Sequence, residues 1–407
     1  MKNLRIWVIA LAGLLAVQSC GEYYEAPDLP GINTRGLATR TSLIDRWTLP
    51  QVDSMINSLG GGASNFLHPQ HGVAAYKVNY QTIDPFGNII AASGAFVVPE
   101  GEGLEAMPLA SYQHGTETAD YNMASQGASE IIIGVVMAST GYLCAMPDYL
   151  GLGEGPGLHY YIHAKSEATS VIDMLRACRD FAPKLGREWD GRLFLFGYSQ
   201  GGHATMATHR EIQNFYEPEF TVTASAPMSG PYDVSGVQEQ VIVSHSPYAT
   251  PGYLPYILYG YNAIYRILPS VNGILKPPYD SIIPPMFDGV YSIGQINEVS
   301  APVPRDMILD SVMTAYEDNP NHPLKVALRD NDLYNWIPKS PVKMFYCSSD
   351  DQVNYQNTLV AYNHFLAAGS TNVSIHETAS NLSHYDCALP TMLFGKFYLD
   401  SLKALPF

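Results

Sequence analysis

A strongly apolar segment is followed directly by a serine that lies between glycines. This sequence pattern restricts the possible fold more than any other feature. Residues 193–196 read Leu-Phe-Leu-Phe, as expected of a buried strand, and residues 197–202 read Gly-Tyr-Ser-Gln-Gly-Gly before a helix-like segment. Glycines are needed there because a sharp turn between strand and helix leaves almost no room for flanking side chains. The pattern predicts that this turn lifts the Ser199 hydroxyl above a sheet as a nucleophile. The alternative is a glycine-rich turn with an inert serine.

A serine hydroxyl is a poor nucleophile at neutral pH, so it needs an imidazole to accept its proton and a carboxylate to orient that imidazole. Sheets that carry this turn place the acid after the serine and the histidine last. The strand-like run 342–348 leads into Asp350 and Asp351, where the acid is expected. We favour Asp350; Asp351 would then face solvent or cap a helix over 354–368.

Three histidines follow these carboxylates in the chain. His364 falls inside the predicted helix, and His376 falls inside a strand-like alternation, so both are better explained as structural residues. His384 lies in the predicted loop 380–385, between the last strand and the last helix. His384 is therefore the predicted general base, and the alternative is a surface loop histidine.

From Leu109 onward, short apolar runs alternate with longer amphipathic segments, which is typical of a parallel sheet with helices on both faces. Two earlier strand-like runs, 73–83 and 89–98, are joined by Asp-Pro-Phe-Gly-Asn and predict an antiparallel hairpin at the sheet edge. The later strands are expected at 108–112, 142–146, 192–197, 220–228, 342–348 and 373–378, and the helices at 125–138, 165–181, 201–216, 354–368 and 386–404.

The alternation stops over residues 231–338, which are rich in proline and tyrosine. An insertion between two core strands predicts a helical cap, or lid, over the carboxyl edge of the sheet, where parallel sheets bind ligands. The core would then consist of residues 46–230 and 339–407. Residues 21–45 have no periodicity and predict a linker, so the fold is expected to begin near Thr48.

The N-terminus has the layout of an export signal. Lys2 and Arg5 precede an apolar run over 6–17, which is too short to span a membrane. Small residues surround Cys20, as in a bacterial lipoprotein signal. We therefore expect residues 1–20 to be a signal peptide, with lipidated Cys20 anchoring the protein to a membrane surface. The alternative is an ordinary secretory signal with a chance cysteine.

The charge and the remaining cysteines exclude other classes of function. The net charge is −16, and no Lys/Arg cluster is present that could follow a phosphate backbone, so nucleic acid is not an expected partner. Export permits disulfides but leaves all three pairings open, and a strand-like setting favours free thiols for two of the four cysteines. Neither the cysteines nor the pair His159 and His163 form a zinc-ligand pattern, so no metal is expected. The four cysteines are Cys144, Cys178, Cys347 and Cys387, of which Cys144 and Cys347 lie in strand-like runs.

The oxyanion of acyl transfer needs preorganised N–H donors, and one comes from the residue after the nucleophile, here Gln200. The second donor is open at this point. Strand 108–112 runs into a His-Gly loop that ends at Thr116, which is one candidate. The other candidate lies in the loop 146–153.

These motifs together resemble the secretory lipase group of α/β-hydrolases, which includes fungal lipases of the Candida lipase A type. The resemblance covers about 109–228 and 342–390, but not the cap. It implies an α/β-hydrolase fold, and it implies that Asp148, in an Asp-x-x-Gly loop, contributes to the oxyanion hole. The matching segments are Ser-Tyr-Gln-His-Gly at 111–115, Pro-Asp-Tyr-x-Gly at 147–151, Leu-Arg-Ala at 175–177 and Gly-Tyr-Ser-x-Gly-Gly at 197–202.

The predicted function is hydrolysis of a carboxylic ester through an acyl-enzyme on Ser199, without a cofactor. Its substrate would be a small-molecule ester or lipid, with short-chain or acylglycerol esters first and acyl groups on polysaccharides second. A serine peptidase of the same fold would use the same three residues. A non-catalytic binding lipoprotein is a further alternative, against which the complete serine, acid and histidine set argues.

Overall fold

The protein is described here by a computed structural model, which covers residues 24–25, 34–60, 62–268 and 273–405. The predicted signal peptide 1–20, with Cys20, lies outside the described residues. Within the described part of the chain, no helix combines the length and the apolar character needed to cross a membrane.

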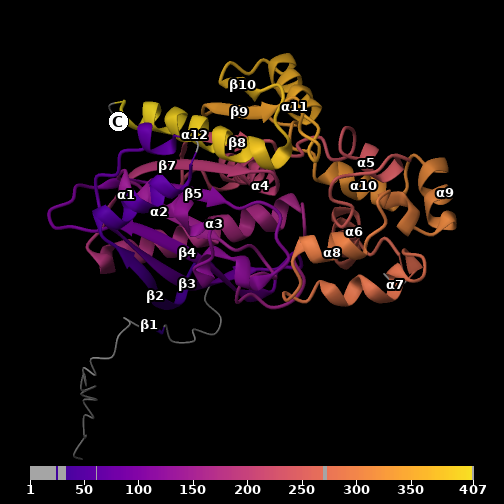
Figure 1. Ribbon diagram of the computed structural model, residues 1–407, viewed down its shortest axis with the longest axis horizontal. Coiled ribbons are helices and arrows are strands. Elements are labelled where there is room, and N and C mark those ends of the chain that lie inside the picture. The colour runs from indigo at the N-terminus through magenta and orange to yellow at the C-terminus, as the bar shows by residue number, and fades with distance from the viewer. Residues whose placement is uncertain (1–23, 26–33, 61, 269–272, 406–407) are drawn as a thin grey trace, which may run out of the picture.

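The core is one ten-stranded sheet with the order β1-β2-β3-β4-β6-β5-β7-β8-β9-β10 (Figure 1). Strands β1 to β4 pair antiparallel, β4 also pairs antiparallel with β6, and the pairs from β6 through β5 to β10 are parallel. The predicted hairpin, formed by β3 and β4, and the predicted parallel sheet are confirmed. The hairpin does not lie at the sheet edge, because β2 pairs with β3 and β1 pairs with β2. The strands are β1 (Tyr24–Glu25), β2 (Ala38–Trp47), β3 (Val73–Ile83), β4 (Ile89–Pro99), β5 (Met107–Gln113), β6 (Leu143–Pro147), β7 (Trp189–Tyr198), β8 (Val222–Met228), β9 (Val342–Cys347) and β10 (Val373–Ala379).

Helices cover both faces of this sheet because neighbouring strand residues point to opposite sides and are apolar on both. One face packs against α1, α2 and α12, and the other packs against α3, α4 and α11. These helices are α1 (Leu49–Ser58), α2 (Ile131–Ser139), α3 (Ala164–Phe181), α4 (Gln200–Glu211), α11 (Gln356–Ala367) and α12 (His384–Lys403); a π-helical turn, η5 (Ile212–Tyr216), extends α4.

The structure differs from the sequence expectations at several element boundaries. The helix expected from residue 125 begins only at Ile131, because a separate 3₁₀ turn occupies residues 124–126. The predicted linker 21–45 extends too far, because β2 begins at Ala38 and pairs with β3 along its length. The charged residues of β2, including Asp45 and Arg46, hide the apolar–polar alternation by which a strand is identified from sequence. The last helix begins at His384 rather than at 386, since the Ser383 side chain caps it by accepting from the Asp386 N–H.

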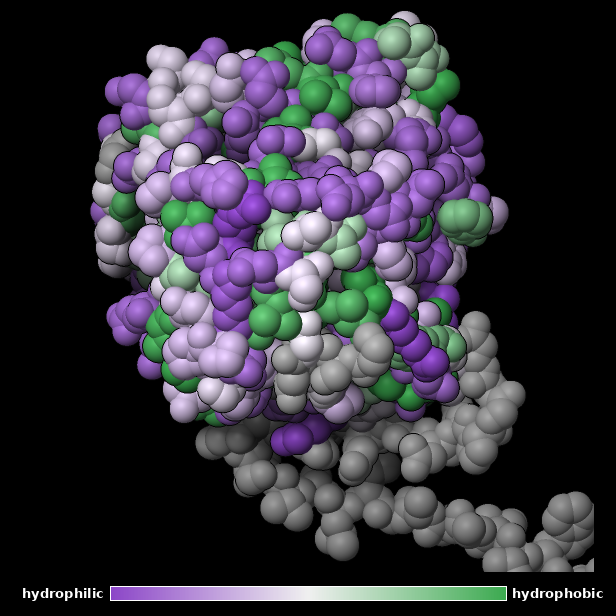
Figure 2. Space-filling view, turned by 90° about the vertical axis from the view of Figure 1, so that its right-hand side faces the viewer, coloured by the Kyte–Doolittle hydropathy of each residue, from purple (hydrophilic) through white to green (hydrophobic). Residues whose placement is uncertain are grey.

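All the α-helices assigned between β8 and β9 in the described residues form one group at the right of Figure 1. They contact loops that follow parallel strands: the Tyr256 hydroxyl donates to the Glu117 carbonyl, and the Tyr253 hydroxyl donates to Gln352 Oε1. The group therefore lies over the carboxyl edge of the sheet. Its surface is mainly hydrophilic, with separate apolar patches (Figure 2). These helices are α5 (Gln240–Val243), α6 (Tyr253–Tyr265), α7 (Tyr279–Ile282), α8 (Ile293–Val299), α9 (Asp310–Asp318) and α10 (Pro323–Asp330).

Candidate active site

Ser199 occupies a strained turn between β7 and α4, with φ 61° and ψ −122°. Its backbone N–H donates to the Met228 carbonyl at 2.9 Å, which anchors the turn to β8. A Cβ on Gly197 would lie 2.5 Å from the Gln113 carbonyl oxygen, and one on Gly201 would lie 1.9 Å from it. Only glycine fits at both positions, so the local sequence forces Ser199 to the carboxyl edge of the sheet.

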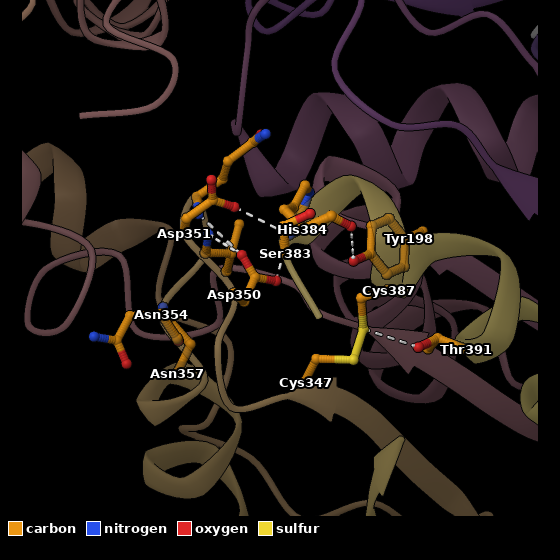
Figure 3. A network of polar contacts seen from close by, with 12 residues as sticks. Tyr198, Cys347, Asp350, Asp351, Asn354, Asn357, Ser383, His384, Cys387 and Thr391 are labelled. Atoms are coloured by element: carbon orange, nitrogen blue, oxygen red, sulfur yellow. Dashed lines mark hydrogen bonds and ion pairs between the residues drawn. A yellow bond between two sulfur atoms is a disulfide. The ribbon is translucent and has the colours of Figure 1, made fainter. Parts of the chain in front are cut away.

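Asp350 and His384 form a hydrogen-bonded pair at the same edge (Figure 3). The His384 Nδ1–H donates to Asp350 Oδ2 at 2.7 Å, and the two side chains are 5% and 1% exposed. Asp350 Oδ1 accepts from the backbone N–H of Gln352 and Val353 at 3.0 and 2.8 Å, so the carboxylate is fixed before it meets the ring. The pair has the geometry of an orienting acid and a general base.

Asp351 has a different place from its neighbour. Its Oδ1 accepts from the backbone N–H of His384 at 3.0 Å, at the start of α12. It therefore holds the main chain of His384 and leaves the imidazole to Asp350. Asp351 is exposed, as one of the two predicted alternatives has it, whereas the helix end that it meets is that of α12, since α11 begins only at Gln356.

Tyr198 joins the histidine to the serine turn. Its hydroxyl donates to the His384 carbonyl at 2.7 Å, and the two rings are 4.9 Å apart between centroids. Because Tyr198 directly precedes Ser199, this contact brings α12 beside the turn. Residues 199, 350 and 384 thus converge at one edge of the sheet.

A disulfide reinforces this arrangement (Figure 3). Cys347 at the end of β9 is bonded to Cys387 in the first turn of α12, 40 residues later. The bond ties the segment that carries Asp350 to the helix that carries His384. The expectation of a free Cys347 is wrong, because sequence does not show which helix covers β9; Cys144 and Cys178 are buried free thiols.

We expect the Cys347→Ala/Cys387→Ala double variant to lose about 3–4 kcal/mol of unfolding free energy, because opening a 40-residue loop restores freedom to the unfolded chain. Chemical denaturation measures this loss. The control is Cys178→Ala, which keeps the disulfide and should lose less. Equal denaturation midpoints for the double variant and the wild type would contradict the prediction.

Two groups near Ser199 are candidates for oxyanion donors. Gln200 is the first residue of α4, so its N–H has no partner within the helix. The His-Gly loop lies beside the turn, since a Cβ on Gly115 would be 3.8 Å from the Tyr198 carbonyl oxygen. The Thr116 hydroxyl, next in this loop, shares a hydrogen bond of 3.0 Å with the Tyr161 hydroxyl.

Asp148 has other partners, although the family resemblance implied an oxyanion role for it. Its N–H donates to the Ser93 carbonyl at 3.0 Å, and its Oδ2 accepts from the Ser93 hydroxyl at 2.6 Å. Burial raises the pKa of this carboxyl group. The backbone N–H and the carboxyl group of Asp148 both bind Ser93 of β4. Asp148 therefore anchors the loop after β6, and its N–H is not free to donate to an oxyanion.

A buried polar network lies behind Gln200, and the sequence analysis missed it. The Gln200 side-chain amide donates to Glu167 Oε1 at 2.9 Å and to His159 Nε2 at 2.7 Å. Glu167 Oε2 accepts from His203 Nδ1 at 2.6 Å, and His203 Nε2 contacts the Asn331 carbonyl at 3.1 Å. The network fixes the start of α4 and links it to the segment after α10. One signal was available: position 167 shares a helix face with apolar 171, 174 and 178.

The two histidines four residues apart have structural roles. Burial lowers the pKa of His159 to about 4, so its ring is neutral at pH 7 and accepts from Gln200 through Nε2. Its Nδ1–H donates to the Leu150 carbonyl at 2.8 Å. His163 caps α3, where its side chain accepts from the Ser166 N–H.

We expect Glu167→Ala to lower the free energy of unfolding by about 3–5 kcal/mol, because it leaves buried His203 and Gln200 without their shared acceptor. Glu167→Gln keeps one carbonyl oxygen in place and should lose clearly less. Thermal and chemical denaturation of the three proteins test this. Wild-type stability in Glu167→Ala would show that the network contributes nothing.

A mainly apolar pocket opens beside Ser199, between the sheet edge and the helices that follow β8. Gln200 is part of its wall on the core side. Tyr161 and Ile162 belong to the loop before α3, and Tyr253, Leu254 and Ile257 come from α6. An ester carbonyl at Ser199 would therefore meet polar N–H groups on one side and apolar side chains on the other.

Comparisons with known proteins place the chain in a family. The secretory lipase family model matches residues 116–390, which is more than half of the chain. Among curated proteins, none matches the chain by sequence.

Several solved structures are similar to the chain. A ligand-bound form of the rice cell wall degrading esterase LipA from Xanthomonas oryzae is 27% identical, with a TM-score of 0.78 over 90% of this chain and 96% of that chain. A protein from Legionella pneumophila is 26% identical, with a TM-score of 0.83 over 91% of this chain and 99% of that chain. Candida antarctica lipase A in its closed state, at 14% identity and a TM-score of 0.69 over 93% and 85%, shares the fold. The chain therefore belongs to the secretory lipase family, and it is a carboxylic ester hydrolase with an α/β-hydrolase fold.

Proposed function

We propose that the protein hydrolyses carboxylic esters through an acyl-enzyme on Ser199. His384 accepts the serine proton as Oγ attacks the ester carbonyl carbon, and Asp350 holds the imidazole in the orientation and tautomer that this step needs. His384 then gives the proton to the departing alcohol. In the second half it activates water, which releases the carboxylic acid and restores the serine.

The observation that carries this proposal is the 2.7 Å bond from His384 to Asp350, next to a serine with φ 61°. In the proposed cycle the oxyanion accepts from the N–H of Gln200 and from the His-Gly loop at Thr116. Asp148 acts at a distance, by fixing the neighbouring loop to β4.

We further propose that residues 231–338 form a cap that selects the substrate. Support comes from the apolar wall that α6 gives the pocket at Ser199. Such a wall suits acylglycerol or short-chain esters. Acyl groups on polysaccharides are a second candidate, favoured by the likeness to an esterase that degrades rice cell walls.

The family assignment fits export, and we propose that export proceeds through the signal at residues 1–20. Lipidation of Cys20 would leave the enzyme at a membrane surface while the catalytic domain remains in water.

A screen of matched substrates tests the proposed function. It compares p-nitrophenyl esters of graded chain length, the corresponding p-nitroanilides and an acetylated polysaccharide. We expect turnover of esters and little or none of anilides. Faster anilide cleavage would instead assign a peptidase, and release of acetate from the polysaccharide alone would favour the second candidate.

A further inference from the structure

A second apolar cavity, of about 280 Å³, lies between α2 and α12. It is on the opposite face of the sheet from α4, and it is separate from the pocket that Ser199 lines. Ile133 and Val136 form one wall, Ala388 and Met392 form the other, and Phe196 of β7 belongs to the floor.

The packing around α2 shows that this space is unusual. The helix reads Ile-Ile-Ile-Gly-Val-Val-Met-Ala-Ser and is apolar on all sides, as in helices that are fully buried. Protein interiors contain few voids larger than a water molecule, yet the side of α2 toward α12 faces an open space. Apolar cavities of this size take up apolar ligands.

The two charged side chains that line the cavity are already paired within the protein. Glu130 and Lys396 are its charged lining residues. The Tyr112 hydroxyl donates to Glu130 Oε2 at 3.3 Å, and Lys396 donates to Asp400 Oδ2 at 2.6 Å. Both groups already have partners, and the remaining lining is almost entirely apolar. An alkyl chain is the ligand that fits such walls.

Two lining residues of the cavity directly precede residues of the candidate active site in the chain. Gly115 and Tyr198 line the cavity, and they come just before Thr116 and Ser199. Ala388 lies one helical turn after His384 on α12. A chain whose carbonyl carbon lies at Ser199 could therefore enter this space beside the His-Gly loop.

We infer that the cavity between α2 and α12 binds the alkyl chain of the acyl group, and that the enzyme acts on esters of medium-chain or longer fatty acids. This inference rests on the proposed function, since it takes Ser199 as the acylated residue. The pocket beneath α6 would then receive the alcohol part of the ester.

Three valine substitutions test the inference on the full chain. Val136→Phe fills the cavity between α2 and α12, Val241→Phe fills the pocket beneath α6, and Val326→Phe lies on the surface, 44% exposed, as a matched control. The readout is the ratio of kcat/KM for p-nitrophenyl dodecanoate to that for p-nitrophenyl acetate. We expect Val136→Phe to lower this ratio at least tenfold and Val326→Phe to leave it at the wild-type value. A fall with Val241→Phe but not with Val136→Phe would overturn the inference.

A binding measurement separates this inference from the proposed function. Calorimetric titration of dodecanoate should show binding to the wild type and at least tenfold weaker binding to Val136→Phe. Absence of all ester turnover together with this loss of binding would refute the proposed function alone. Unchanged binding in Val136→Phe would refute the cavity as the chain site. If Val136→Phe does not fold, Ile133→Trp fills the same cavity from the next position along the wall.

Discussion

Replacing Ser199 with alanine is expected to lower kcat/KM for ester substrates by about 10⁴- to 10⁶-fold. The reason is that no other group occupies the tip of the turn between β7 and α4, so the covalent route disappears with the hydroxyl. The fold should survive, because the turn is held by the backbone bond from Ser199 to Met228 and by its glycines.

Initial rates on p-nitrophenyl esters, with circular dichroism for the fold, measure this effect. The matched control is Ser229→Ala, a buried serine at the end of the neighbouring strand. Its turnover should stay within about tenfold of the wild-type value. A tenfold change corresponds to about 1.4 kcal/mol in the activation free energy. If Ser199→Ala is folded and retains most of its activity, the nucleophile is another group.

The second large effect separates two neighbouring carboxylates. Asp350→Asn should lower kcat by about 10⁴-fold, because an amide in place of the carboxylate favours the wrong imidazole tautomer and no longer stabilises the imidazolium. Asp351→Asn should cost less than about tenfold, since its amide oxygen can still accept from the His384 backbone N–H.

The comparison is made on the same esters at the same pH, with KM determined for each variant. Asp350→Asn should affect kcat far more than KM, because Asp350 touches the imidazole and lies outside the apolar pocket at Ser199. Equal losses in the two variants, or a larger loss in Asp351→Asn, would contradict the roles assigned here.

The sequence predicted the parts of this molecule that depend on local chemistry. The turn at Ser199 requires glycines because the neighbouring backbone leaves no room for a Cβ. The turn could therefore be recognised as a sequence motif. The parallel sheet was visible in its alternating apolar runs. The positions of Asp350 and His384 followed from the order of strands along the chain.

Other features depend on tertiary packing and were not visible. The pairing of Cys347 with Cys387 depends on α12 lying against β9, which no local pattern encodes. Strand β2 was missed because its charged residues mask its alternation, although it pairs fully with β3. Asp148 matched a family motif, but its hydrogen bonds to Ser93 could be read only in three dimensions.

The network around Glu167 shows the same limit. Its members come from α3, α4 and the loop before α3, and each alone reads as an ordinary polar residue. Burial makes these contacts necessary, because a buried carboxylate is stable only when it is paired. His203 and Gln200 are the partners of Glu167.

The most direct test of the account is covalent labelling with a fluorophosphonate probe, followed by mass spectrometry of the digested protein. Ser199 becomes reactive only if an imidazole removes its proton, so the account predicts a single modified peptide that carries the label on Ser199. The label should be lost in His384→Ala and strongly slowed in Asp350→Asn. Labelling of a different serine, or undiminished labelling of Ser199 in folded His384→Ala, would contradict the account.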